Sequence, residues 1–246
     1  ILQIIFFIPS FILKTEKYYD IVGSLTYIVT VSLAYFSVEN KTVIDSIIYF
    51  YVMIWASRLG IYLFRRVRND GKDVRFEKAK RQFLYFLQYW MGQALWVSLT
   101  ACAAIVAILS PEEDTLPVLA MVGMVLWLSG FTIESISDYQ KRVFRKENNP
   151  SQAFIHTGLW ARSRHPNYFG EITLWTGIAV IALNTLTGIE YITLISPVFV
   201  YILLTRMSGI NLLERIADER YGHLEEYQRY KSTTPVLIPN LFKNKT

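Results

Sequence analysis

Long apolar stretches alternate with short polar connections along nearly the whole chain. A helix needs about twenty apolar residues to cross the hydrocarbon core of a bilayer. Stretches of this kind, with few charges inside them, occur at residues 1–13, 21–38, 43–64, 84–109, 117–137, 171–187 and 190–206. The pattern therefore predicts an all-α protein, a polytopic membrane bundle of about seven transmembrane helices that forms a single domain over residues 1–246.

The connections between these stretches differ in charge. Residues 65–81, residues 138–149 and the tail after Arg206 are rich in Arg and Lys, whereas the alternate connections are short. Cytoplasmic loops of membrane proteins carry an excess of Lys and Arg. The basic connections and the C-terminus are therefore predicted to be cytoplasmic. The first stretch lacks the basic leader and cleavage site of a signal peptide, so it is interpreted as a span.

The composition supports a membrane protein and limits the other classes. Of the 246 residues, 52% are hydrophobic, and the net charge is +5. The basic residues are clustered between apolar stretches, which argues against nucleic-acid binding. Cys102 is the single cysteine, so no disulfide can form within the chain. The three histidines do not have the spacing of zinc ligands, and no metal is predicted. A phosphate-binding G-x-G-x-x-G or P-loop motif is absent as well.

One predicted helix, over residues 131–146, carries a polar face where it leaves the membrane. Glu134, Asp138 and Arg142 recur every four residues, and Arg145 follows three later. Residues at this spacing share one side of a helix, where ordinary ion pairs would explain them. Glu134 lies at the membrane boundary, where an unpaired carboxylate is costly. It is therefore expected to have a charged partner or a bound polar ligand.

The segment "SRHPNYFGE", residues 163–171, precedes another apolar stretch. Pro166 has no N–H group and restricts the residue before it, so a turn is predicted there, with the next helix starting at Asn167 or Tyr168. The N-terminus of a helix offers unpaired N–H groups and the positive end of the helix dipole. Beside Arg164, such a terminus suits a ligand that bears a phosphate or a carboxylate.

Simpler explanations exist for the polar residues of this turn. Arg162 and Arg164 could contact lipid headgroups, and His165 could donate a capping hydrogen bond. Glu171 could be held by the positive end of the helix alone. The amide of Asn167 combines a donor and an acceptor, which suit a carboxamide or a sugar hydroxyl. These alternatives stay open at the level of the sequence.

Two further regions contribute polar side chains. Residues 211–240 form a strongly polar helix after the last span, interpreted as a cytoplasmic lid over the same pocket. In the early spans, Arg58 and Tyr62 share a helical face, and Gln93 lies within a span. These three indicate either a polar cavity or hydrogen bonds between helices.

Three segments resemble a superfamily of membrane enzymes: residues 133–145, 158–177 and 213–239, with weaker support from residues 18–25 and 55–76. The superfamily contains the steroid 5-alpha-reductases, the sterol C14 and C7 reductases and, more distantly, the isoprenylcysteine carboxyl methyltransferases. The chain is most similar to a bacterial and plant branch that resembles the C-terminal domain of 3-oxo-5-alpha-steroid 4-dehydrogenase. The likeness is most specific over residues 131–240.

The resemblance implies an integral membrane enzyme that takes up NADPH from the cytoplasm. No obligate protein partner is indicated. The short, loop-poor chain favours a bacterial inner membrane. Positions that correspond to cofactor contacts in reductase relatives are Glu134, Asp138, Arg145, Arg164, His165, Asn167, Tyr168 and Glu171. The segment that closes over the cofactor is expected to contribute Arg215, Asp218, Arg220, Tyr221 and Tyr227.

The implied reaction is hydride transfer to the C=C bond of a hydrophobic enone, steroid-like or isoprenoid, drawn from the lipid bilayer. An acid that hydrogen-bonds the carbonyl would stabilise the developing enolate. Tyr62 is the predicted acid, and Arg58 and Gln93 are predicted substrate contacts. Animal 5-alpha-reductases carry a Gln-Glu pair in an early span, which the segment "LQIIFFIPSF" does not contain, and Trp55 stands near the place of their tyrosine.

Two other functions remain open. A methyltransferase that uses S-adenosylmethionine shares the Arg-His-Pro-x-Tyr turn and entry from the cytoplasm, but its cofactor has no phosphate to match Arg142, Arg145, Arg162 and Arg164. A lipid-binding or transport protein would distribute polar residues along a route through the bundle. Here they are concentrated at one end.

Overall fold

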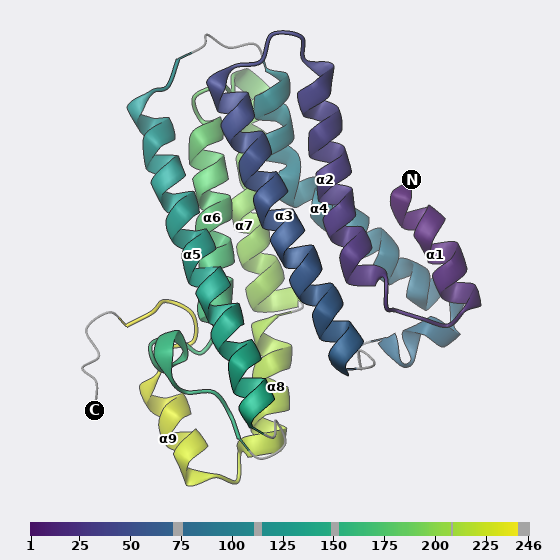
Figure 1. Cartoon of the computed structure of the whole chain (residues 1–246), viewed down its shortest axis with the longest axis vertical. Coiled ribbons are helices and arrows are strands. Elements are labelled where there is room, and N and C mark those ends of the chain that lie inside the picture. The colour runs from purple at the N-terminus through teal and green to yellow at the C-terminus, as the bar shows by residue number, and fades with distance from the viewer. Residues whose placement is uncertain (71–75, 111–114, 149–152, 208, 241–246) are drawn as a thin grey trace. The chain divides into compact units, whose positions relative to one another are not determined.

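The structure is a computed structural model that describes residues 1–70, 76–110, 115–148, 153–207 and 209–240, with the backbone alone for residues 66–70. Most of these residues are helical and none is in a strand, which confirms the all-α prediction (Figure 1). Parts of the predicted basic connections 65–81 and 138–149, and of the short connection between the stretches 84–109 and 117–137, lie outside the described ranges. The helices are α1 (Leu2–Ile12), α2 (Tyr19–Ser37), α3 (Val43–Asp70), α4 (Phe83–Leu109), α5 (Val118–Glu147), α6 (Pro166–Ala182), α7 (Ile195–Ile202), α8 (Ile210–Tyr221) and α9 (Glu225–Thr233), with short 3-10 helices at Ala79–Arg81, Gly158–Ala161 and Gly188–Leu194.

The described part of the chain contains five segments that are long and apolar enough to cross a membrane, namely Tyr19–Ser37, Val43–Arg65, Phe83–Leu109, Val118–Glu147 and Gly188–Tyr221. The chain is thus a multi-pass membrane protein. The other two predicted spans are shorter: α1 has 11 residues and α6 has 17. At about 1.5 Å per residue, α6 extends about 25 Å, less than the roughly 30 Å of hydrocarbon. The count of seven spans stays a prediction.

The sixth predicted span, 171–187, is displaced toward the N-terminus in α6. The helix ends at Ala182 because polar side chains after it bind its last carbonyl groups. The amide of Asn184 donates to the Ile181 carbonyl at 2.9 Å, and the Thr185 hydroxyl donates to the Ala182 carbonyl at 3.0 Å. Local bonds of this kind compete with continuation of the helix.

The seventh predicted span, 190–206, is a composite element. It begins as the 3-10 helix Gly188–Leu194, continues as α7 and ends as a π-helical turn over Leu203–Met207. A capping box begins this element: the Thr187 N–H donates to the Glu190 carboxylate at 2.8 Å, and the Glu190 N–H donates to the Thr187 side chain. The apolar pattern predicted the segment but not its changes of helical pitch.

The described residues form two compact units. The first comprises residues 1–120 and 181–196, and within it α2 packs on α3 and α4, while α1 packs on α4 (Figure 1). Aromatic side chains fill its core, where the Tyr19 ring lies 4.7 Å from Phe76 and 5.4 Å from Trp90 between centroids. Each such pair contributes about 0.5–1.5 kcal/mol beyond its burial.

The second unit comprises residues 121–180 and 197–246, and within it α5 and α6 pack closely against each other in an antiparallel arrangement. Glycines let the two backbones touch. A Cβ atom on Gly170 would lie 2.6 Å from the carbonyl oxygen of Gly130, and one on Gly177 would lie 2.6 Å from the N atom of Trp127. Small residues allow this close approach between membrane helices. The contact brings the C-terminal half of α5 alongside the start of α6, where the predicted polar residues lie.

The polar tail, predicted as one helix over 211–240, forms two helices, α8 and α9, and that prediction is wrong. The break falls at Gly222, whose N–H donates to the Asp218 carbonyl at 2.8 Å. A Cβ atom there would overlap the same oxygen, so the tight end of α8 requires glycine. The amide of Gln228 donates to the Gly222 carbonyl at 2.8 Å and fixes the corner between the two helices.

Candidate functional site

The polar face predicted on α5 meets the start of α6. Glu134 and Asp138 are buried, with 2% and 4% of their surface exposed. The side-chain amide of Asn167, the second residue of α6, donates to Asp138 at 3.4 Å. The glycine contact between the helices, one turn away at Gly170, is what brings this pair together. Two residues predicted from separate motifs are therefore neighbours.

The predicted turn before α6 is present, and the helix begins at Pro166, a favoured first position because its missing N–H is not needed there. Ser163 holds the turn from within, since its hydroxyl oxygen accepts the His165 N–H at 3.2 Å. The same hydroxyl donates to the Leu237 carbonyl at 2.7 Å, and the Arg164 N–H donates to the Pro235 carbonyl at 2.9 Å. The chain after α9 therefore lies along this turn.

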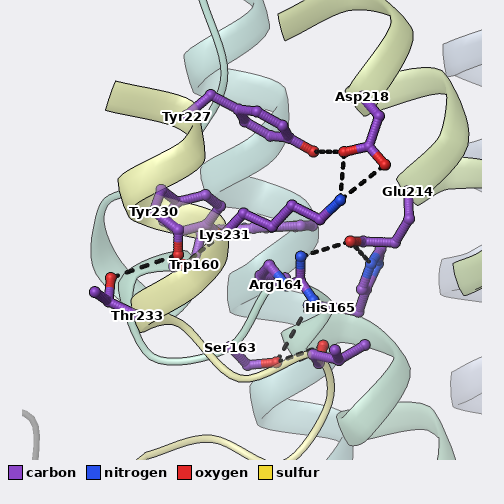
Figure 2. A network of polar contacts seen from close by, with 11 residues as sticks. Trp160, Ser163, Arg164, His165, Glu214, Asp218, Tyr227, Tyr230, Lys231 and Thr233 are labelled. Atoms are coloured by element: carbon purple, nitrogen blue, oxygen red, sulfur yellow. Dashed lines mark hydrogen bonds and ion pairs between the residues drawn. The ribbon is translucent and has the colours of Figure 1, made fainter. Parts of the chain in front are cut away.

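Glu214, on α8, joins the two central residues of the turn (Figure 2). One carboxylate oxygen pairs with the Arg164 guanidinium at 2.6 Å, and the other lies 2.8 Å from Nε2 of His165. The His165 ring in turn stacks on Tyr168, with centroids 5.6 Å apart. Burial lowers the pKa of His165 below its ordinary value, with smaller contributions from Lys141 and Arg164, while Glu214 opposes the shift. The imidazole is thus neutral near pH 7 and donates from Nε2.

Asp218, one turn later on α8, makes a second set of contacts (Figure 2). Lys231 on α9 reaches both of its carboxylate oxygens, at 2.6 and 2.8 Å. The hydroxyl of Tyr227 donates to the same carboxylate at 3.1 Å. The hydroxyl of Tyr230 donates to the Trp160 carbonyl at 2.8 Å. Burial is the largest cause of the raised pKa of Tyr227 and of Tyr230, so both hydroxyls stay protonated and can donate hydrogen bonds.

These groups surround a hollow within the second unit. Among the described residues, its wall carries four cationic side chains and one carboxylate, that of Glu214. Aromatic rings make up much of the rest, and Phe154 lies among them, 5.2 Å from Tyr227 and 5.4 Å from Tyr230 between centroids. Cations and rings together suit a ligand that combines negative charge with flat ring systems. The cations are Lys141, Arg145, Arg164 and Arg220, and the rings are Phe144, Phe154, Trp160, His165, Tyr221, Tyr227 and Tyr230.

Arg164 retains a donor for such a ligand. Its Nε–H is buried and has no hydrogen-bond partner among the described residues. A buried donor that lacks a partner costs about 1–3 kcal/mol, so a bound acceptor there would be stabilising. The buried Nε–H of Arg164 therefore favours an anionic ligand in the hollow, independently of the number of cationic side chains in its wall.

The structure separates the predicted cofactor residues into three groups. Two of them are set apart from the hollow's wall: Arg215, whose side chain is 70% exposed and lies 3.9 Å from Glu219, and Glu171, which is half-buried on α6. The residues that line the hollow are Arg145, Arg164, His165, Arg220, Tyr221 and Tyr227. The third group comprises Tyr168 and Asp218, which contact the lining residues His165 and Tyr227, and Glu134, Asp138 and Asn167, which lie where α5 meets α6.

Several residues of the hollow were not among the predicted contacts. Lys141, Trp160 and Phe154 line it, and Lys231 binds Asp218 next to it. Lys141 was detectable, because positions 134, 138, 141 and 145 follow the four-three-four spacing of one helix face better than the spacing that includes Arg142. The ammonium of Lys141 lies 4.7 Å above the Trp160 ring. Trp160 and Phe154 have no such sequence signal.

The predicted substrate residues belong to the first unit, and the structure gives one of them a structural partner. The side-chain amide of Gln93, on α4, donates to the Tyr19 carbonyl at 3.2 Å and packs against Gly23 on α2. This is the hydrogen bond between helices that the sequence left as an alternative. Arg58 and Tyr62 lie four residues apart on α3, both half-buried.

Comparison with known proteins gives a family and several relatives. A family model described as "Protein of unknown function (DUF1295)" matches residues 6–234. The chain is 31% identical to 3-oxo-5-alpha-steroid 4-dehydrogenase 1 of Mus musculus over 121 residues, which cover 49% of this chain and 42% of that protein. For the Homo sapiens protein of the same name the identity is 26% over 122 residues, with coverages of 50% and 42%. The chain thus matches less than half the length of these relatives. No solved structure matches it significantly. The resemblance inferred from the sequence segments is confirmed.

Proposed function

The chain belongs to the family described as protein of unknown function (DUF1295), and from that membership and the geometry of the hollow we propose that it is an NADPH-dependent membrane reductase. Its substrate would be a hydrophobic enone, steroid-like or isoprenoid, whose C=C bond is reduced. Curated relatives named as steroid dehydrogenases support the class of reaction.

One observation carries the proposal: a hollow lined by cations and aromatic rings, with a buried Arg164 donor that has no partner among the described residues. A dinucleotide has phosphates for the cations and flat rings for the aromatic side chains. When bound, NADPH would supply the hydride. The side chains that would hold it are the cations Lys141, Arg145 and Arg220 and the tyrosines on α8 and α9. Asn167, fixed by Asp138, has an amide suited to a carboxamide or a sugar hydroxyl.

The remaining predicted roles belong to the same proposal. Tyr62 would donate a hydrogen bond to the substrate carbonyl, with Arg58 and Gln93 as substrate contacts. The chain would form one membrane domain of seven spans in a bacterial inner membrane. The hollow would face the cytoplasm, on the side of the basic connections. Neither nucleic acid nor an obligate protein partner would be needed for the reaction.

The first test is a thermal-shift titration of detergent-purified protein with NADPH, NADH and S-adenosylmethionine in parallel. A ligand that binds only the folded state raises the apparent stability by mass action. Stabilisation by NADPH, followed by NADPH oxidation when a 4-ene-3-oxo steroid or an isoprenoid enone is added, is the expected result. Stabilisation by S-adenosylmethionine alone would replace the reductase with a methyltransferase, the alternative left open by the Arg-His-Pro-x-Tyr turn.

The role of Tyr62 is tested by Tyr62→Phe, with Tyr51→Phe on the same helix as the matched control. Loss of a general acid lowers kcat by roughly 100-fold or more while NADPH binding is unchanged. Equal activity of the two variants would exclude Tyr62 as the acid.

The orientation is tested with single cysteines in a Cys102→Ser background. A cysteine replacing exposed Arg229 on α9 should react with an impermeant reagent only from the cytoplasmic side, and one replacing Ile189 only from the other side. Labelling of both from one side would contradict the topology.

A further inference from the structure

Two carboxylates on one face of α8 have the same pattern of partners. Glu214 pairs with a cation and a ring of the turn before α6, Arg164 at 2.6 Å and His165 at 2.8 Å. Asp218, four residues later, pairs with a cation and a ring of α9 in the same way (Figure 2). In a helix, residues four apart lie one above the other. The acidic face of α8 therefore organises two separate segments of the chain around the hollow.

Glu214 differs from Asp218 in its position relative to the hollow and in its burial. Glu214 lines the hollow, together with Arg164 and His165, and its side chain is 20% exposed, against 43% for Asp218. Its partners are more buried still, at 11% for Arg164 and 7% for His165. Buried charge pairs depend strongly on geometry, and removal of one member leaves the other uncompensated. The orientation of both partners is therefore sensitive to this one carboxylate.

The charge of Glu214 has the wrong sign for direct contact with a phosphate. A carboxylate in the wall of a site repels an anionic ligand, and its removal would by itself strengthen binding of that ligand. A carboxylate that sets the orientation of cationic and polar donors has the opposite effect, because its removal disorders the groups that bind. The direction of the change in affinity therefore separates the two roles.

We propose that Glu214 is a positioning residue: it holds the guanidinium of Arg164 and the imidazole of His165 so that both face the hollow, and it acts on a bound anion only through them. The inference rests on the proposed function in taking the anion to be NADPH. It gives Glu214 a role that neither the sequence motifs nor the predicted cofactor contacts included.

The test compares Glu214→Gln with Glu219→Gln in the full chain, using the dissociation constant for NADPH in detergent. Glu219 lies on the same helix, and its side chain is 71% exposed, with Arg215 as its ion-pair partner at 3.9 Å. We expect Glu214→Gln to bind NADPH about tenfold more weakly, the effect of one charge-assisted hydrogen bond, and Glu219→Gln to bind as wild type. Unchanged or tighter binding by Glu214→Gln would overturn the proposal.

A double-mutant cycle shows whether Glu214 acts through Arg164. Arg164→Lys keeps the charge but loses the planar fork that the carboxylate holds. In this background the additional effect of Glu214→Gln on the NADPH dissociation constant should fall from about tenfold to about twofold. The full tenfold loss in both backgrounds would show that the two residues act independently, and the proposal would be wrong.

A measurement without ligand separates this proposal from the proposed function. In protein with 15N-labelled histidine, His165→Gln assigns the His165 signal, and the midpoint of its titration reports its contact with Glu214. Glu214 favours the charged imidazole, so Glu214→Gln should move the midpoint to lower pH, whereas Glu219→Gln should not. If wild type binds no NADPH, the proposed function fails. The His165 titration then still tests the positioning role of Glu214, because an unchanged midpoint in Glu214→Gln means that Glu214 does not hold His165.

Discussion

The close contact between α5 and α6 leads to a prediction about both stability and the site. Gly170→Ala adds a Cβ atom that would lie 2.6 Å from the Glu134 N atom and 2.6 Å from the Gly130 carbonyl oxygen. Both are backbone atoms of α5, which cannot rotate away as a side chain can. The helices must therefore separate at this point, next to the pair formed by Asn167 and Asp138.

The size of the effect follows from two opposing terms. Alanine in place of glycine inside a helix is favourable by about 0.5–1 kcal/mol, because it restricts the unfolded chain. Overpacking against a rigid neighbour costs about 1–3 kcal/mol. The net destabilisation expected for Gly170→Ala is therefore up to about 2.5 kcal/mol. For a chain of this size that corresponds to a fall in Tm of up to roughly 10 °C.

Gly92→Ala is the matched control. Gly92 also lies inside a long helix, α4, but nothing is within 4 Å of its Cβ position. We expect this variant to gain about 0.5–1 kcal/mol, whereas Gly170→Ala loses stability and, by moving Asn167, binds NADPH more weakly. Both variants are measured by thermal unfolding in the same detergent, with and without NADPH. A gain in stability for Gly170→Ala as large as that for Gly92→Ala would refute the close contact between these helices.

Three further predictions concern single side chains. Asn167→Ala should abolish NADPH stabilisation while the ligand-free protein stays folded; normal NADPH binding would remove Asn167 from the site. Tyr230→Phe should lower the free energy of unfolding by about 0.5–1.5 kcal/mol, because its hydroxyl donates to the buried Trp160 carbonyl, and Tyr191→Phe, at an exposed position, should not. His165 has a lowered pKa, so below its ordinary value of about 6.5 the unfolded chain binds a proton that the folded one does not, and stability should fall as the pH drops below that value. Lys141 and Arg164 strengthen this effect, Glu214 weakens it, and His165→Gln should remove the dependence, as measured by Tm against pH.

The sequence by itself determined the fold class and much of the candidate site. Hydrophobic stretches fixed where the long helices run, because a helix in lipid must satisfy its backbone internally and present apolar side chains. The segments around Asp138 and Arg164 were sufficient to indicate the family, which the comparisons confirmed. Glu134 was singled out by the cost of a carboxylate at the membrane boundary, and it is buried.

Only the tertiary structure decided which polar residues meet. Glu214 and Arg164 are fifty residues apart in the chain, and the sequence offered no reason to pair them rather than assign Arg164 to a ligand. Local details also escaped the pattern: the break at Gly222 depends on a carbonyl one turn away, and α6 stops at Ala182 because Asn184 and Thr185 bind its last carbonyls. Hydropathy records how apolar a segment is, whereas ion pairs and helix ends depend on which atoms come within hydrogen-bond distance after folding.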